Sequence, residues 1–220
     1  RTGLLSAAEP YETIDTAALA LQTGKPDSAA ALLYAVVDRI SDRGEQVRAM
    51  YYLAQALGKL GRTGEKLQYL TRAAEMDSTS AFAEYVRHAH AEALLETGNI
   101  NGCISLAQQF MRSYPDSPLM PEVLFLTGKA HLADREWLKA FNAFSEITKS
   151  FPETRTAREA VLQEGICLYR LQLFSGAISR LEKYLADNPK GESCGEALYY
   201  LGLACEETGR LEAAAEAFRK

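Results

Sequence analysis

The 220-residue sequence lacks the features that mark several large classes of protein. No run approaches the ~18 consecutive apolar residues that a membrane-spanning helix needs. Prolines are few, seven in all, in a chain that is 47% hydrophobic, which favours a folded, helical protein over a disordered one. The net charge of −5 argues against a general nucleic-acid or anionic-membrane surface, because such surfaces need clustered positive charge. The chain starts at Arg1 without a signal peptide, so we expect a processed or trimmed start.

Recognisable catalytic and metal-binding patterns are also missing. There is no glycine-rich phosphate loop, no nucleophile elbow and no HExxH motif. His88 and Glu92 lie one helical turn apart, but this pair would supply only two ligands, fewer than a zinc site takes. Pairs of this kind are usually solvated contacts on a helix face. We therefore predict a protein with no enzymatic activity, no cofactor and no metal site.

The four cysteines form no CxxC pair and have no zinc spacing with histidine. Cys103 and Cys205 fall at positions that other parts of the chain fill with small or apolar residues, which predicts buried side chains. Cys194 lies in a predicted connection and is expected to be the more exposed thiol. The pattern is compatible with a reducing compartment and does not prove one.

What the sequence does contain is a repeat of 37 residues. Glycine, alanine and proline recur in this register in four sets: Gly24, Gly61 and Gly98, with Gly209 three steps further on; Gly128, Gly165 and Gly202; Ala140, Ala177 and Ala214; Pro115, Pro152 and Pro189. Four sets in one register indicate a tandem repeat, in which each unit packs mainly on its neighbours.

The segment from Pro121 to Pro152 shows what one unit contains. Apolar and small residues at helical spacing, from Leu124 to His131, precede a break at residues 133–135. A second helical stripe follows, formed by Ala140, Phe144 and Ile147. Pro152 ends this stripe because proline lacks an amide donor. The unit is therefore predicted to be two amphipathic helices joined by a tight turn.

Small residues recur at one position of each predicted helix, where they would let a neighbouring helix approach closely. On the first helices they are Ala17, Ala54, Ala91, Gly128, Gly165 and Gly202, and on the second helices Ala29, Cys103, Ala140, Ala177 and Ala214. Lys66 interrupts the second series. Either its stem lies along the helix interface with the ammonium group reaching solvent, or the register is looser there.

The turns between the paired helices carry Gly24, Gly61, Gly98 and Gly209, which suit a left-handed conformation that ends a helix. Arg135 and Gln172 occupy the equivalent positions of the other two turns. We expect these turns either to use another geometry or to tolerate strain, and we expect departures from the ideal repeat at Lys66, Arg135 and Gln172.

These features resemble the tetratricopeptide repeat, in the stretches "LTGKAHLADREWLKAFNAFSEITKSFP", "QEGICLYRLQLFSGAISRLEKYLADNP" and "YLGLACEETGRLEAAAEAF". The resemblance implies an all-α fold, a right-handed superhelical α-solenoid of about six helix pairs with the last pair incomplete. Residues 1–9 would be an N-terminal lead-in, and residues 10–220 one continuous solenoid without a hinge. Its units would start near residues 10, 47, 84, 121, 158 and 195.

The 37-residue period exceeds the usual 34 by three residues, which fall after the prolines. Ser80, Ser117 and Thr154 share one position there and are expected to cap the following helices, with Pro118 at a first helical position. The extra residues are expected to lengthen each first helix by close to one turn. Units of this kind resemble bacterial envelope proteins of the Tol-Pal accessory and outer-membrane assembly lipoprotein types. The resemblance implies a periplasmic or outer-membrane-associated protein, with the cytoplasm as the alternative.

In tetratricopeptide arrays the first helices line a concave face that holds a partner peptide. The resemblance assigns this groove to Tyr51, Gln55, Tyr85, His88, Glu92, Phe125, Lys129, Leu162, Ile166, Tyr199 and Leu203. Aromatic side chains in such a groove are typical anchors, but packing against the adjacent repeat is the alternative for each of them. The lysine and asparagine pattern of the chaperone-type carboxylate clamp is absent. Binding of a chaperone C-terminus is therefore not expected.

The sequence thus predicts a non-enzymatic interaction scaffold that binds a protein or peptide in a concave groove. One alternative is a structural element that assembles with itself or with a larger complex, or a fragment of a larger cytoplasmic scaffold. Another is an enzyme or ligand-binding domain framed by the repeats. No polar capping helix is visible after Phe218. We therefore expect that the chain continues or that its uncapped C-terminal end supports a homo-oligomer.

Overall fold

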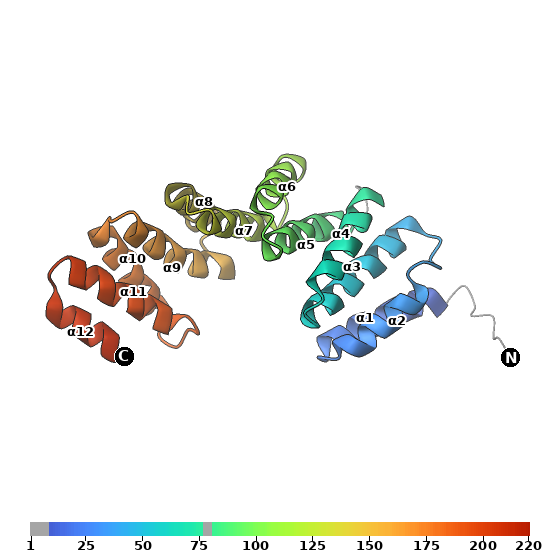
Figure 1. The fold of residues 1–220 in the computed structure, drawn as a ribbon, viewed down its shortest axis with the longest axis horizontal. Helices are drawn as coiled ribbons and strands as arrows, with labels where there is room; N and C mark the ends of the chain where they lie inside the picture. Colours follow the sequence, from blue (N-terminus) through green and yellow to red (C-terminus); the bar gives the residue numbers. More distant parts are fainter. Residues whose placement is uncertain (1–8, 77–80) are drawn as a thin grey trace. The chain divides into compact units, whose positions relative to one another are not determined.

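The computed structural model describes residues 9–76 and 81–220. These residues form twelve α-helices and no strand, in six successive pairs (Figure 1). The first helices of the pairs are α1 Glu9–Gln22, α3 Arg43–Lys59, α5 Ala83–Glu96, α7 Met120–Ala133, α9 Arg155–Arg170 and α11 Cys194–Glu207. The second helices are α2 Pro26–Val36, α4 Thr63–Met76, α6 Ile100–Ser113, α8 Trp137–Ser150, α10 Phe174–Asp187 and α12 Leu211–Arg219. The prediction of an all-α repeat fold is confirmed.

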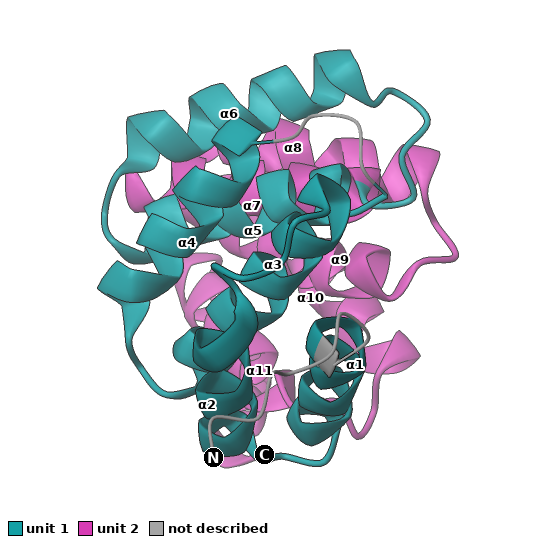
Figure 2. Cartoon of the chain, turned by 90° about the vertical axis from the view of Figure 1, so that its right-hand side faces the viewer, with its two compact units in different colours: residues 1–119 teal, residues 120–220 magenta. Residues whose placement is uncertain are grey.

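The chain divides into two compact units, coloured separately in Figure 2. Unit 1 spans Arg1–Leu119 and contains α1 to α6, whereas unit 2 spans Met120–Lys220 and contains α7 to α12. Within each unit every helix packs on the next, and successive first helices also contact each other. The single continuous solenoid over residues 10–220 stays a prediction. Except for Glu9, the predicted lead-in lies outside the described residues.

The small residues of the first helices do allow close packing, most clearly at Gly128. A Cβ atom at Gly128 would lie 2.5 Å from the ring of Phe144, which is fully buried on α8. A Cβ at Gly165 would likewise lie 2.7 Å from Leu181 on α10. The paired helices are therefore closer here than an alanine would permit.

All six turns within pairs use the left-handed conformation. The turn glycines have φ between 72° and 80°, while Arg135 and Gln172 adopt φ of 58° and 61°. The same backbone hydrogen bond closes each turn: the amide of Glu136 donates to His131 O, and that of Leu173 to Leu168 O, both at 2.9 Å. Of the two expectations, another turn geometry is therefore wrong, and the two non-glycine residues accept the strain.

Lys66 keeps the repeat in register. The residue is only 5% exposed, and its side chain passes close to Gly58, where a Cβ would lie 3.2 Å from Lys66 Cδ. The ammonium group emerges beside α5 and lies 2.9 Å from both carboxylate oxygens of Glu96. Of the two expectations for Lys66, the lysine stem lying along the helix interface is confirmed.

The extra residues of the repeat mostly lie in connections and not in longer helices. α5, α7 and α11 contain 14 residues, as α4, α6, α8 and α10 do, whereas α3 and α9 contain 17 and 16. The expected extra turn is therefore wrong for α5, α7 and α11. Before α7 and α11 the chain instead forms turns closed by the amides of Ser117 and Gly191, which donate to Tyr114 O and Asn188 O.

The predicted capping residues have three different outcomes. Thr154 caps α9, since its hydroxyl accepts the amide of Ala157 at 3.1 Å. Ser117 and Pro118 lie before α7 begins at Met120, so neither occupies its predicted place. The Ser117 hydroxyl accepts the amide of Leu119 at 3.1 Å and donates to Glu84 on α5. Ser80 lies outside the described residues.

Each unit has its own buried core of alanine, leucine, valine and isoleucine. All four cysteines are free thiols. Cys103, Cys167 and Cys205 are buried, and Cys194 is half-buried with its thiol donating to Asn188 O. Burial, and secondarily the Glu164 carboxylate, raises the pKa of Cys167 to about 12. None of the described helices is both long and apolar enough to span a membrane.

Candidate interaction surfaces on the first helices

The most developed surface lies on the first helices of unit 1. Four rings meet there and are called the aromatic cluster below: Tyr51 and Tyr52 of α3, Phe82 just before α5, and Tyr85 of α5. Their neighbouring centroids are 5.5–6.1 Å apart, with tilted or edge-on planes. Tyr85 is 43% exposed and the other three are half-buried. The cluster therefore joins two successive repeats and still presents aromatic surface to solvent.

Charged groups hold one side of this cluster. The guanidinium of Arg48 lies 5.8 Å from the ring centre of Tyr52 and 5.9 Å from that of Phe82. Asp15 on α1 and Glu45 on α3 form ion pairs with Arg48. The arginine therefore ties three successive parts of unit 1 together and covers the Tyr52 and Phe82 faces with positive charge.

The predicted groove residues Gln55, His88 and Glu92 are half-buried on α3 and α5. Tyr51 has a raised pKa, first because it is buried, and then because Tyr52, Tyr85 and the Glu92 carboxylate lie near it. The Gln55 side chain hydrogen-bonds to Tyr51 and opposes this shift. The Tyr51 phenol is therefore neutral under ordinary conditions. Of the five predicted groove residues of unit 1, Tyr51, Gln55, Tyr85 and Glu92 are neighbours.

A shallow pocket of about 210 Å³ continues the surface toward α1. It is lined by Ala18, Leu21, Gln22, Tyr51, Tyr52, Gln55 and Lys59. Lys59 donates to Leu21 O at 3.2 Å, which directs its ammonium group to the backbone of α1. The pocket thus offers apolar, amide and phenol groups beside the aromatic cluster.

In unit 2 the predicted groove residues divide into accessible and buried ones. Phe125 and Lys129 line a hollow of about 420 Å³ with Leu132 and Gln163. The Phe125 ring also packs on Phe144, with centroids 5.2 Å apart, so packing is one of its roles. Leu162 and Ile166 are 0% and 6% exposed. Their assignment to an open groove is corrected, because both belong to the core of unit 2 and leave a partner no surface.

Tyr199 and Leu203 lie on α11. Tyr199 is 55% exposed and contacts the rings of Tyr200 and Phe218 at centroid distances of 5.5 and 6.3 Å. Leu203 is half-buried. Tyr199 therefore presents the larger part of its ring to solvent, as an anchor would, although it also packs against its neighbours.

Sequence reasoning missed Tyr52 and Phe82, which complete the aromatic cluster. Tyr52 and Tyr200 occupy equivalent positions of the repeat, and each packs beside an aromatic neighbour on its own helix. This recurrence is the sequence pattern that could have indicated Tyr52 as a member of the cluster. Phe82 follows residues outside the described range and has no such repeat partner, so only the structure places it.

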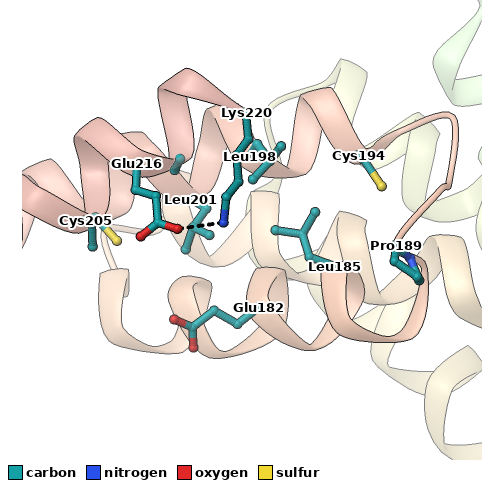
Figure 3. A pocket seen from close by; sticks show the side chains of 11 residues that line it. Glu182, Leu185, Pro189, Cys194, Leu198, Leu201, Cys205, Glu216 and Lys220 are labelled. Carbon is teal, nitrogen blue, oxygen red and sulfur yellow. Dashed lines mark ion pairs between the residues drawn. The ribbon is translucent and has the colours of Figure 1, made fainter.

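A cavity of about 560 Å³ lies in unit 2 among α10, α11 and α12 (Figure 3). Its wall is mainly apolar, with Leu185, Leu198 and Leu201, and an ion pair between Glu216 and Lys220 lies beside it. One repeat earlier the equivalent space is about 110 Å³, and Tyr184 and Asp187 of α10 line it together with Asn188, which follows the helix. We assign this cavity no ligand.

The described part of the chain contains no group of three histidine, cysteine or carboxylate side chains that could hold a metal ion. His131 hydrogen-bonds to Glu136 at 2.8 Å beside the strained turn at Arg135. His90 lies 3.2 Å from the hydroxyl of Thr71 and thereby links α5 to α4. Both histidines have structural partners.

Paired helices with close-packed small residues and uniform left-handed turns define a helical repeat protein. The family model for the tetratricopeptide repeat matches residues 14–81 and 162–220. These two segments are more than half of the chain, which belongs to the tetratricopeptide repeat family.

Comparisons with individual proteins are consistent with this family. The outer membrane protein assembly factor BamD of Caulobacter vibrioides is 25% identical over 113 residues, a match that covers 51% of this chain and 36% of that protein. The chain thus matches only about a third of the length of that relative. Two solved structures share the fold. A tetratricopeptide repeat protein of Parabacteroides merdae has a TM-score of 0.74 at 15% identity, covering 94% of this chain and 77% of that one. MamA of Desulfovibrio magneticus has a TM-score of 0.67 at 16% identity, covering 81% and 93%.

Proposed function

We propose that the protein is a non-enzymatic scaffold that binds a segment of a partner protein on the first-helix faces of its repeats. The aromatic cluster of unit 1, with Tyr85 43% exposed, carries this proposal. Rigid aromatic side chains gain much contact area for little lost conformational freedom, which makes them frequent anchors of protein interfaces. The accessible groove residues of unit 2, Phe125, Lys129, Tyr199 and Leu203, would provide contacts on the first-helix faces of that unit.

The test is partner recovery with alanine variants on two sets of positions. Tyr85→Ala, Phe125→Ala and Tyr199→Ala should each weaken recovery of one identified partner from the native organism, with unchanged helical content by circular dichroism. Gln108→Ala and Lys149→Ala are matched controls, because both side chains are exposed on second helices. Unchanged recovery in the first set, with loss in the second, would instead support an assembly element that works through the second-helix faces.

We further propose that this scaffold acts in the bacterial cell envelope. The similarity to an outer-membrane assembly factor supports this placement. Fractionation of the native organism should recover the protein with periplasmic or outer-membrane markers. Recovery with cytoplasmic markers alone would refute the placement and leave the binding proposal intact.

A further inference from the structure

We propose that unit 1 selects a cationic side chain of its partner, an arginine or a lysine, which lies over Tyr51 and Tyr85 with its charge directed to Glu92. The proposal deepens the proposed function and rests on it. It concerns the first-helix face of α3 and α5, which belong to the same unit.

The aromatic cluster already holds one cation. Arg48 covers the rings of Tyr52 and Phe82 at 5.8 and 5.9 Å, the range in which a cation is attracted to the negative face of a ring. Among the described residues no cation lies over Tyr51 or Tyr85, although Tyr85 is 43% exposed. Tyr52 and Phe82 therefore have a cationic partner within the described residues, whereas the exposed Tyr85 and the half-buried Tyr51 have none there.

The charge next to these two rings is negative. Glu92 and Glu96 on α5 share the single ammonium group of Lys66, at 3.5 and 2.9 Å. Their side chains are 45% and 42% exposed, whereas that of Lys66 is only 6% exposed. Two carboxylates against one buried cation leave a surplus negative charge at the edge of the aromatic cluster. The Glu92 carboxylate is near enough to Tyr51 to contribute to its raised pKa, and it lies two helical turns from Tyr85 on α5.

The other cations of this face are already engaged. Arg48 is paired with Asp15 and Glu45, and Lys59, which lines the pocket together with Tyr51, donates its ammonium group to Leu21 O of α1. An incoming cation would therefore meet a ring face and a carboxylate, while neutral parts of the partner would fill the pocket of about 210 Å³.

Unit 2 provides a contrast at the same positions of the repeat. Lys129 stands where Glu92 stands in unit 1, and Phe125 stands where His88 does. The hollow beside Phe125 therefore carries a positive charge, and a partner cation would be repelled there. The cationic preference is expected in unit 1 only.

The experiment is an NMR titration of the full chain with ¹³C-labelled tyrosine rings. The probe is the capped peptide acetyl-Ala-Arg-Ala-amide, and the control is the same peptide with citrulline, which is close in shape to arginine but uncharged. We expect saturable shifts of Tyr51 and Tyr85 with the arginine peptide, binding at least about fivefold tighter than the citrulline peptide, and little change at Tyr199.

Two variants sharpen the test. Glu92→Gln should weaken the arginine peptide by about threefold or more, because the carboxylate is lost while Lys66 keeps Glu96. Tyr85→Ala should weaken it similarly. Glu207→Gln, an exposed glutamate of unit 2, is the matched control and should change nothing. Thermal unfolding of each variant checks that the fold is retained.

Equal binding of the two peptides, shifts centred on Tyr199, or no shift at about 10 mM peptide would overturn the inference. If Tyr85→Ala still weakens recovery of the protein partner in that case, the scaffold proposal stands and only the cationic preference fails. If the arginine peptide binds as expected but partner recovery is unaffected by Tyr85→Ala, the proposed function fails instead.

Discussion

The two units place their glycines differently. In unit 1 all three turns contain glycine, Gly24, Gly61 and Gly98, and the close-packed position of the first helices is alanine. In unit 2 that helix position is glycine, at Gly128, Gly165 and Gly202, while Arg135 and Gln172 occupy two of the three turns. Both units nevertheless keep the same turn conformation.

The residue that faces this position from the second helix explains why the first helices carry glycine in unit 2 and alanine in unit 1. Phe144, Leu181 and Phe218 face the three glycines of unit 2, with contacts too short for a Cβ atom. The equivalent residues of unit 1 are Leu33, Leu70 and Ala107, opposite alanines. A larger residue on the second helix is therefore accompanied by a smaller one on the first helix in unit 2, as expected for a densely packed interior. Different residue pairs thus fill the same space between the paired helices.

The largest change in stability is predicted for a substitution that adds a methyl group in unit 2. Gly128→Ala places a Cβ against the buried Phe144 ring and should destabilise unit 2 by about 1–3 kcal/mol, although alanine normally favours a helix. Urea unfolding followed by the fluorescence of Trp137, the only tryptophan and a residue of α8, reports this unit.

The double variant Gly128→Ala with Phe144→Leu copies the Ala17 and Leu33 pair of unit 1 and should recover most of the loss. A single variant as stable as the wild type would contradict the packing explanation. Ala54→Gly in unit 1 is the converse control and should lose about 1 kcal/mol through helix propensity.

The next effect concerns Lys66 of unit 1. Lys66→Ala removes a buried stem beside Gly58 and should destabilise unit 1 by about 1–2 kcal/mol through lost packing. In three other repeats the equivalent pair combines a leucine with a small residue, as in Leu95 with Cys103. Gly58→Leu with Lys66→Ala should therefore restore stability. Circular dichroism in urea measures both, and failure of the double variant would show that the ion pairs matter more than the stem.

A smaller gain is expected at the strained turns of unit 2. Arg135→Gly and Gln172→Gly should each stabilise the unit by roughly 0.5–1 kcal/mol, because relief of the left-handed strain exceeds the added freedom of glycine in the unfolded chain. The reciprocal change Gly61→Arg should destabilise unit 1 by a similar amount. Chemical unfolding of the three variants tests this, and a loss of stability in Arg135→Gly would refute it.

The smallest effect is a pH dependence located in unit 1. Burial lowers the pKa of His90, Arg87 lowers it further, and Glu75 opposes the shift. The unfolded chain therefore binds this proton more readily than the folded one, so stability is present above pH ~6.5 and is lost as the pH falls toward the lowered folded pKa. His90→Thr, the residue found at the equivalent Thr127, should show a smaller loss between about pH 7 and 5. Equal losses in wild type and variant would contradict it.

The helix pairs and their turns could be predicted because each depends on residues close in the sequence. Apolar spacing defined the helices, and the left-handed turns followed from glycine at four of six positions. Leu162 and Ile166 could not be recognised as buried, because their accessibility depends on how α9 packs among its neighbours. The aromatic cluster could not be predicted either. It includes Phe82, whose position depends on how the chain enters α5.

The most direct test of binding on the first-helix faces is photo-crosslinking in the native organism. Benzoylphenylalanine replaces Tyr85 and Tyr199 in turn, with Gln108 and Lys149 on second helices as control positions. Binding on the first-helix faces predicts crosslinks to one and the same identified partner at Tyr85 and Tyr199 and none at the controls. Crosslinks to that partner at Gln108 and Lys149, with none at Tyr85 and Tyr199, would contradict it.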